Sequence, residues 1–305
     1  MHIILNMVFI LLMPLFMLGI VRRVKSLWSG RKGVPLMQVF FDVRKLLLKG
    51  EVLSSCSSFV FKATPIISLA ALLTAATVVP MAGGKALMGF HGDFIFFSYL
   101  FALSRFFAVI GALDTGSSFE GMGAGREAMF AVFGEPGFFV IMSSLAYMGG
   151  CRSFADIFSA IQSSSTTFYP CGVLAAAGLF IFMLADACRM PVDDPATHLE
   201  LTMVHEVMVL DNSGPSMAFI TYGAALRIFL LSSIIAGLFL PAGMPFAGEI
   251  ILYALSLFAV AVVVGAVESI MARMRMVHVP QFLFIISAFG MVLFFIVLMG
   301  RGGIK

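Results

Sequence analysis

The sequence predicts an all-α membrane protein whose eight transmembrane helices form a single domain over residues 1–305. Three observations support this fold class. The chain is 61% hydrophobic and only 11% charged, with a mean hydropathy of +1.06, values that soluble domains do not approach. Eight apolar runs each approach the ~20 residues that a helix needs to cross a bilayer. Lys and Arg residues gather in alternate loops between these runs.

The predicted spans follow one another without a soluble linker or a low-complexity tract. They cover residues 3–21, 63–82, 94–112, 125–148, 171–188, 217–240, 246–267 and 280–299. The first run lacks an A-x-A cleavage site, so we expect it to remain in the protein as a span. A chain that consists mostly of spans leaves no room for a separate soluble catalytic domain.

The distribution of basic residues predicts the orientation in the membrane. Nine Lys and Arg residues lie between the first two spans, at residues 22–62, and four more lie in other loops on the same side. The opposite side has four. Because positively charged loops stay in the cytoplasm, both termini are predicted to lie outside, with the protein in the inner (cytoplasmic) membrane.

The first loop contains an amphipathic segment between Pro35 and Gly50. Its apolar residues share one helical face: Leu36, Phe40, Val43 and Leu47. Its polar residues share the opposite face: Gln38, Asp42, Lys45 and Lys49. One interpretation is a helix that lies on the lipid surface, and the other is a docking platform for a cytoplasmic partner. The candidate docking residues are Arg31, Lys32, Asp42, Arg44, Lys45 and Lys49.

The loop before the sixth span is the most acidic part of the chain. Five of the sixteen carboxylates fall within nineteen residues: Asp193, Asp194, Glu200, Glu206 and Asp211. Two histidines lie among them, His198 and His205. Asp194 can cap a helix that has Pro195 as its first residue, and we expect this helix to continue to Gly214-Pro215. On such a helix the two histidines, which are seven residues apart, share a face.

Glu135 is the charged residue that most strongly suggests function, because it lies inside the fourth span next to Pro136. Proline removes a backbone donor from the helix, and a carboxylate there is costly unless it is paired, protonated or hydrated. Arg227 lies near the middle of the sixth span and is therefore expected to have a buried acidic partner. Arg105 is expected to reach the membrane surface with its long side chain.

Further charged residues lie near the ends of spans. Asp186 and Arg189 are three residues apart, so they are expected to pair with each other. Glu268 closely precedes Arg273 and is expected to form an ion pair at the end of its helix. Glu127 lies near the start of the fourth span, where a negative charge complements the helix dipole.

Several kinds of site are disfavoured by residue spacing. The four cysteines form no C-x-x-C pair, which argues against an iron–sulfur or zinc site in this chain. His205-Glu206 lacks the second histidine of a zinc protease, because residue 209 is Val. The histidines of the acidic loop could in principle hold a metal, but such histidines more often form hydrogen bonds. The glycine-rich loop 114–127 fits no phosphate-binding pattern. No catalytic residue, metal or nucleic-acid partner is predicted.

The acidic loop also contains a longer motif, Pro191-Val-Asp-Asp-Pro-Ala-Thr-His-Leu-Glu-Leu-Thr-Met-Val-His-Glu-Val-Met-Val-Leu-Asp-Asn-Ser-Gly-Pro215. It resembles the signature loop of the membrane-anchor subunit of group 4 nickel–iron hydrogenases, which comprise the formate hydrogenlyase, hydrogenase-4 and energy-converting hydrogenase types. This family is homologous to the complex I subunit that forms the quinone cavity, the NADH dehydrogenase subunit 1 family. Three other blocks resemble the same family, at residues 30–52, 105–127 and 267–283.

This resemblance implies eight spans and a non-catalytic role in an oxidoreductase complex. The chain would bind no cofactor itself. It would hold an iron–sulfur small subunit and a nickel–iron large subunit on the cytoplasmic side, beside antiporter-like membrane subunits and lipid. It would couple their electron transfer to proton or sodium translocation. The resemblance places one set of carboxylates in the cavity and its link to the ion pathway: Glu127, Glu135, Asp193, Asp194, Glu200, Glu206 and Asp211.

Asp186 and Glu268 complete the candidate ion pathway. The candidate partners of its buried carboxylates are Arg105, Arg126, Arg189, Arg227, His198 and His205. The alternative function is the quinone-cavity subunit of a complex I-like quinone oxidoreductase. Ala196 and His198 stand where that branch tends to have Glu, which favours the hydrogenase branch. A stand-alone ion transporter is less favoured, because the chain shows neither inverted repeats nor paired broken helices. A plain structural anchor would tolerate neutral residues at Glu135 and at the loop glutamates.

Overall fold

The computed structural model describes residues 2–82, 86–163, 168–193, 203–241 and 245–302. All regular structure in these ranges is helical, which confirms the predicted fold class. Eight helices are long and apolar enough to cross a membrane, so the chain is a multi-pass membrane protein. They are α1 (His2–Trp28), α3 (Phe59–Val78), α4 (Asp93–Asp114), α5 (Ser118–Gly149), α7 (Phe168–Asp186), α9 (Gly214–Phe239), α10 (Phe246–Ile270) and α11 (Val279–Gly302).

Each long helix overlaps one predicted span, but most extend further. The largest extensions are in α1, which ends at Trp28 and not at residue 21, and in α5, which begins at Ser118 and not at residue 125. Polar residues in these end turns lower the local hydropathy, so a search for apolar runs stops short of them. In the fold the same residues find partners inside the protein and stay helical. Helix α5 also continues through Pro136.

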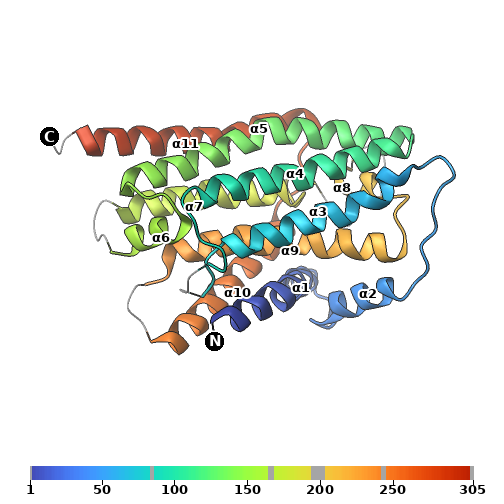
Figure 1. The fold of residues 1–305 in the computed structure, drawn as a ribbon, viewed down its shortest axis with the longest axis horizontal. Coiled ribbons are helices and arrows are strands. Elements are labelled where there is room, and N and C mark those ends of the chain that lie inside the picture. The colour runs from blue at the N-terminus through green and yellow to red at the C-terminus, as the bar shows by residue number, and fades with distance from the viewer. Residues whose placement is uncertain (1, 83–85, 164–167, 194–202, 242–244, 303–305) are drawn as a thin grey trace.

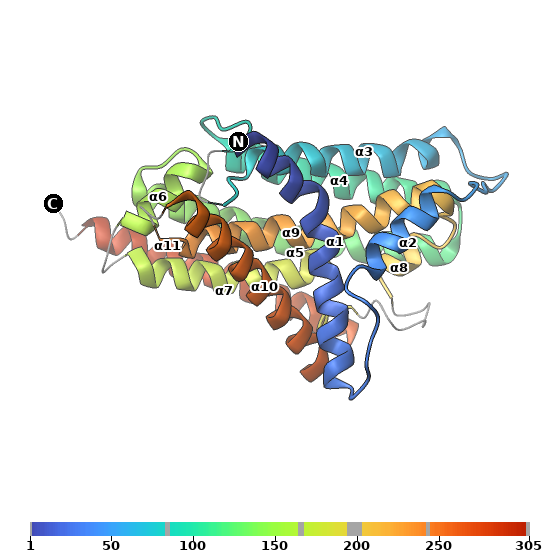
Figure 2. The same cartoon turned by 90° about the horizontal axis from the view of Figure 1, so that it is seen from below.

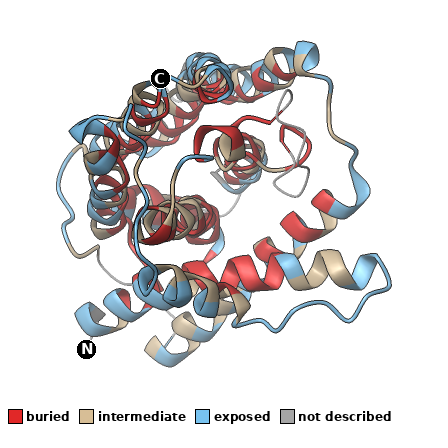
Figure 3. Ribbon diagram, turned by 90° about the vertical axis from the view of Figure 1, so that its right-hand side faces the viewer, coloured by how far each residue is buried: buried red, intermediate tan, exposed pale blue. Residues whose placement is uncertain are grey.

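Helix α9 lies at the centre of the bundle. It packs against α1, α2, α3, α6, α7 and α10, whereas α5 pairs with α11, α3 with α4 and α1 with α10 around it (Figure 1). Nearly every residue of α9 from Ala225 to Leu238 is buried, as expected for a helix that is apolar on all sides. Figure 3 shows the buried residues turned toward the inside of the group of helices and the exposed ones outward.

Shorter helices close the two ends of the bundle. Helix α6 (Phe154–Ser163) lies at one end, and α2 (Gln38–Leu47) and α8 (His205–Met208) lie at the other, here named the α2 end (Figures 1 and 2). A single helical turn, η1 (Met276–His278), leads into α11. The eight long helices alternate in direction, so the two chain ends lie on the side opposite the α2 end.

Helix α2 confirms the amphipathic segment but presents a different face to the protein. Val39 is fully buried and Val43 partly buried against the core, whereas Phe40 and Leu47 of the predicted apolar face are 42% and 48% exposed. Asp42 fixes this rotation, because it accepts a hydrogen bond from Gln38 at 2.9 Å and pairs with Arg22 of α1 at 3.4 Å. Aromatic and aliphatic side chains therefore remain on the open side of α2.

The predicted helix from Pro195 to Gly214-Pro215 is wrong for the residues that the structure describes. Residues 194–202 lie outside the described ranges, and between Met203 and Ser213 only the four residues of α8 are helical. Gly214 and Pro215 begin α9 and do not end a loop helix. The backbone amides of this loop are bonded to side chains of neighbouring elements, which competes with helical hydrogen bonding.

Small residues bring α5 and α11 into close contact beside Glu135. A Cβ atom at Gly137 would lie 2.7 Å from Cγ2 of Ile286 and 3.0 Å from the backbone nitrogen of Ser287. Gly290 approaches α5 in the same way, 3.1 Å from Val140. Close approach through small residues is the usual way in which transmembrane helices associate, because lipid supplies no hydrophobic force between them.

The substitution Gly137→Val is expected to push α11 away from α5 and to lower the stability of the purified protein by about 1–3 kcal/mol. Gly125→Val is the matched control, because Gly125 lies in the same helix and its Cβ would meet nothing within 4 Å. Thermal unfolding in detergent measures both. A shift in midpoint that is equal for the two variants would contradict the close contact.

Candidate functional site

Arg105 of α4 is surrounded by three carboxylates from two other helices. Its Nε atom lies 2.9 Å from Oε1 of Glu127, and its Nη1 atom lies 2.6 Å from Oε1 of Glu135; both glutamates belong to α5. Its Nη2 atom pairs with Oδ1 of Asp186, the last residue of α7. The Arg105 side chain is only 8% exposed. The prediction that it reaches the membrane surface is therefore wrong, because three acidic partners inside the bundle hold it there.

Arg227 of α9 joins the same cluster from the opposite side. Its Nη1 atom lies 3.4 Å from Oδ2 of Asp186, which confirms the buried acidic partner expected for this residue. Its Nη2 atom donates to the Ser104 hydroxyl at 3.0 Å, and its guanidinium lies 5.7 Å from the centre of the Phe101 ring. Ser68 of α3 also reaches Ser104, with 2.8 Å between the two hydroxyl oxygens.

This cluster, here named the Arg105 cluster, consists of Arg105, Arg227, Glu127, Glu135 and Asp186. Two guanidinium groups face three carboxylates, so the described groups include one carboxylate in excess. Its side chains are mostly buried, and Glu135 is the most exposed at 34%. In such surroundings an uncompensated charge is costly, so the excess favours the uptake of one proton or one cation.

Cys188 extends the cluster toward the acidic loop. Its thiol donates a hydrogen bond to Oε2 of Glu127 at 3.5 Å. Burial raises the pKa of the Cys188 thiol well above its usual range, and the neighbouring Glu127 carboxylate raises it further. The thiol is therefore protonated, and it serves as a neutral hydrogen-bond donor to the carboxylate.

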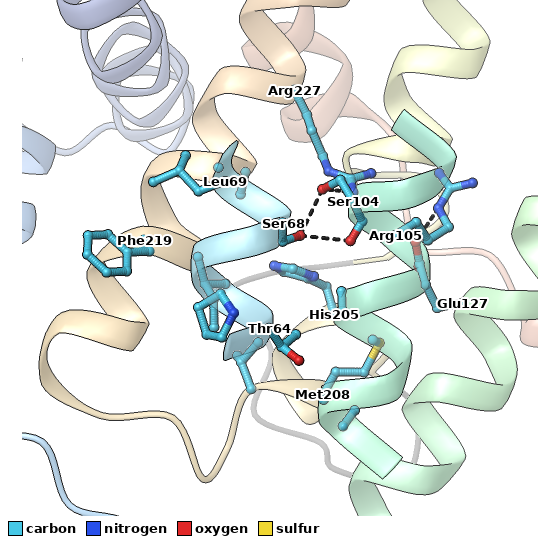
Figure 4. Close-up of a pocket in the computed structure, with 18 of the residues that line it drawn as sticks. Thr64, Ser68, Leu69, Ser104, Arg105, Glu127, His205, Met208, Phe219 and Arg227 are labelled. Atoms are coloured by element: carbon cyan, nitrogen blue, oxygen red, sulfur yellow. Dashed lines mark hydrogen bonds and ion pairs between the residues drawn. The ribbon is translucent and has the colours of Figure 1, made fainter. Parts of the chain in front are cut away.

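A cavity of about 80 Å³ connects the Arg105 cluster with the α2 end (Figure 4). Its walls come from α3, α4, α9 and the segment that contains α8. Arg105, Asp186 and Arg227 lie at the inner end, and Phe61 and Asn212, near the starts of α3 and α9, lie at the other. A cavity of this size holds a few water molecules but is smaller than the roughly 300 Å³ of a typical ligand pocket.

His205 points into this cavity from α8, toward Ser68 and Ser104 (Figure 4). Its predicted pairing with a buried carboxylate is not seen among the described residues, where no ion pair involves it. Glu206 beside it is half-buried, and Asp211 is exposed. The candidates Asp194, His198 and Glu200 lie outside the described residues.

A second group of ion pairs lies at the α2 end. Glu268 of α10 pairs with Lys25 of α1 at 3.0 Å and with Arg189 at 3.2 Å. Both partners come from other parts of the chain, so the expected ion pair within its own helix end is wrong. The expected pair of Asp186 with Arg189 is also wrong, because the two side chains turn to opposite groups.

Three side chains hold the acidic loop by its backbone. Oδ2 of Asp193 accepts from the Val204 amide at 2.9 Å, while Oδ1 pairs with Arg273 at 2.8 Å. Arg126 of α5 donates to the Met203 carbonyl at 2.9 Å. Oε1 of Glu120, also on α5, accepts from the Asp211 amide at 3.0 Å. These three contacts, here named the loop tethers, fix the path of residues 203–211 beneath α5.

Sequence reasoning missed several residues of this site. Lys25 was counted as a loop charge because α1 was expected to end seven residues before its observed end. Glu120 lies in a glycine-rich stretch that was placed outside the membrane, although Ser117-x-x-Glu120 matches a capping box at the start of a helix. Ser68, Ser104 and Cys188 carry no charge in the sequence to distinguish them. Among the described residues, no three His, Cys, Asp or Glu side chains lie close enough together to hold a metal ion.

Comparison with known proteins gives a consistent result. A family model described as NADH dehydrogenase matches residues 1–299. Formate hydrogenlyase subunit 4 of Escherichia coli (strain K12) is 30% identical over 270 residues, which cover 86% of this chain and 87% of the relative. Hydrogenase-4 component C of the same strain is 31% identical over 247 residues, covering 77% and 73%.

More distant similarities agree with these. A membrane component of the NADH-quinone oxidoreductase of Salinibacter ruber is 25% identical over 190 residues, covering 59% of this chain and 55% of the relative. A solved chain from the membrane-bound sulfane sulfur reductase, an archaeal respiratory membrane complex, superposes with a TM-score of 0.84 at 19% identity. The superposition covers 96% of this chain and 97% of the other, and shows that the two share a fold.

Arg105→Met is expected to destabilise the protein by about 3–5 kcal/mol, because it leaves three buried carboxylates without their shared cation. Asp186→Asn in the same chain removes one of those charges and is expected to restore part of the loss. Chemical denaturation in detergent measures the single and double variants. If the double variant is as unstable as the sum of the two single variants, the two residues do not interact.

Proposed function

Because the chain belongs to the NADH dehydrogenase family, whose model matches residues 1–299, we propose that it is the membrane subunit of a hydrogenase-type respiratory complex. In this role it holds a soluble redox module at the membrane surface. It also couples electron transfer in that module to the movement of protons or sodium ions. The formate hydrogenlyase and hydrogenase-4 relatives, which match over more of the chain than the NADH-quinone oxidoreductase relatives, support this branch of the family.

The observation that carries the proposal is the excess carboxylate in the Arg105 cluster. Arg105 is shared by Glu127, Glu135 and Asp186, and Arg227 compensates Asp186 a second time. Glu135 is the most exposed of the three carboxylates and has only Arg105 as an ionic partner among the described residues. Adding a proton at Glu135 would neutralise the excess. It would also leave Arg105 more strongly held by the other two carboxylates.

The route for this coupling runs through the cavity. Redox changes in the soluble module would act first on the acidic loop, which lies at the α2 end and is attached to α5 by the loop tethers. Water in the cavity would connect His205 with the Ser68–Ser104 pair and with the Arg105 cluster. A shift of the loop would therefore change the surroundings of the carboxylates, and with them the protonation state.

The soluble module is proposed to dock at the α2 end. The basic residues around α2 are exposed there: Arg31, Lys32, Arg44, Lys45 and Lys49. The open side of α2 adds apolar area from Phe40 and Leu47, and the exposed Asp211 lies on the neighbouring loop. A mixed apolar and charged surface of this kind suits a protein partner as well as lipid headgroups. The iron–sulfur and nickel–iron centres would belong to the small and large subunits of this module, and antiporter-like subunits would pack beside the bundle.

A quinone oxidoreductase role for the same cavity is less well supported. Quinones are larger than the cavity of about 80 Å³ between α3, α4 and α9. The departures at Ala196 and His198 point the same way, although both residues lie outside the described ranges.

Glu135→Gln is expected to leave the complex assembled and able to turn over while it abolishes ion movement, because the amide keeps the size and hydrogen bonding of the carboxyl but carries no exchangeable acid proton. Ion uptake into sealed vesicles, measured together with substrate turnover, gives the coupling ratio. Asp156→Asn is the control, since Asp156 is an exposed carboxylate on α6 at the opposite end. Unchanged coupling in the Glu135 variant would refute the role given to the cluster.

The α2 end is expected to face the cytoplasm, following the distribution of basic residues. The exposed Cys56 should then react with an impermeant maleimide only from the cytoplasmic side, and only after the soluble module has been removed. Ser159→Cys, placed at the other end in a Cys56→Ser chain, should react only from the outside. Cys151 near that end gives little background, because burial raises the pKa of its thiol. Labelling of both sites from one side would show the topology to be wrong.

A further inference from the structure

Glu120 is a fully buried carboxylate that lies outside the Arg105 cluster. It occupies the first turn of α5, and its residue exposure is 0%. Its Oε1 atom accepts a hydrogen bond from the Asp211 amide at 3.0 Å. Its Oε2 atom is buried and has no hydrogen-bond partner in the described part of the chain. The carboxylate is therefore only half satisfied.

No positive charge compensates Glu120 among the residues that the structure describes. None of the ion pairs found there involves it, and the guanidinium of Arg126, six residues further along α5, donates to the Met203 carbonyl. The polar groups beside Glu120 are the Thr115 side chain, whose hydroxyl donates to a carbonyl of α4 at 2.8 Å, and the acidic side chain of Asp211. A second negative charge makes an ionised Glu120 still more costly.

A second unsatisfied oxygen lies next to Asp211 in the chain. Oδ1 of Asn212 is buried and has no hydrogen-bond donor in the described residues. Asn212 also lines the cavity that leads to the Arg105 cluster. Two buried oxygen acceptors without donors, on side chains linked through the Asp211 amide, require something positive or something that donates a hydrogen.

Helix capping does not explain the burial of Glu120. The pattern Ser117-x-x-Glu120 would direct its carboxylate back to the backbone of Ser117, but the observed bond goes to Asp211 of another segment. A carboxylate near a helix start interacts favourably with the helix dipole whether it is buried or exposed. Glu249 shows the exposed form of this arrangement, because it lies in the first turn of α10 and is only partly buried.

We propose that Glu120 and Asn212 form a binding site for one small monovalent cation, a proton or a sodium ion, at the α2 end of the cavity. A proton on Oε2 would turn this acceptor into a donor, whereas a sodium ion would be bound directly by the two oxygens. The inference rests on the proposed function, in which this cation is the coupling ion. The occupied site would neutralise Glu120 and strengthen the position of the loop tether that it forms with Asp211.

The site also has a mechanical consequence for the loop. Glu120 holds Asp211 while Asn212, the next residue, faces the cavity. Binding or release of the cation would therefore alter the tether on one side and the cavity wall on the other. A contact made by the soluble module on the exposed Asp211 would be felt at the same carboxylate.

The resting, purified complex in nanodiscs tests the site without turnover. Infrared difference spectra compare wild type with Glu120→Gln for the band of a protonated carboxyl group, and equilibrium binding of radioactive sodium is measured on the same samples. A proton site predicts that the carboxyl band of the wild type is lost in the variant. A sodium site predicts saturable sodium binding that is lost in the variant. Glu249→Gln, the control, should change neither.

Absence of both differences would overturn the proposal, since Glu120 would then be an ionised residue without a bound cation. Should Glu120→Gln fail to assemble, Asn212→Leu keeps the carboxylate and removes only the second oxygen. It is expected to weaken sodium binding by about tenfold or more, or to shift the carboxyl band, and no change in either would count against the site. A complex that passes these binding tests but moves no ions would contradict the proposed coupling function and leave the cation site standing.

Discussion

A guanidinium group buried within a membrane domain must be neutralised, and the polar interior of this protein depends on how that requirement is met at Arg105. Its three ionic partners come from two helices, and the same arginine therefore ties α4 to α5 and α7. Arg227 then attaches α9 to Asp186. Four of the central helices meet at one group of charges, so a change in any of these charges bears on the packing of all four.

The cluster and the acidic loop form one continuous structure and not two separate sites. The Arg105 cluster lies at the inner end of the cavity, and the loop tethers lie at the α2 end, where α5 contributes Glu120 and Arg126 to the loop and Glu127 and Glu135 to the cluster. Helix α5 therefore carries both the contacts to the loop and the contacts to the buried arginine. It is the element best placed to transmit a displacement from one to the other.

The spans could be predicted from the sequence because hydropathy is a local property, whereas the pairing of charges is not. Arg105 and Asp186 are 81 residues apart, and Arg189 and Glu268 are 79 apart, so neighbours in the sequence gave the wrong partners. The buried partner of Arg227 was predicted correctly, because an arginine at mid-span needs one wherever it comes from. The loop helix was predicted wrongly for another reason: Pro215 suits the first turn of a helix, and it begins α9, but it was taken as the end of a loop helix.

The loop tethers have a consequence for how such complexes diversify during evolution. On the loop side, all three bonds are made by backbone groups of Met203, Val204 and Asp211. Substituting the outward-facing side chains of these residues leaves the bonds intact, so the path of the loop is conserved while its surface is free to change. One membrane scaffold can thereby acquire new redox partners without rebuilding the charged interior to which the loop is attached.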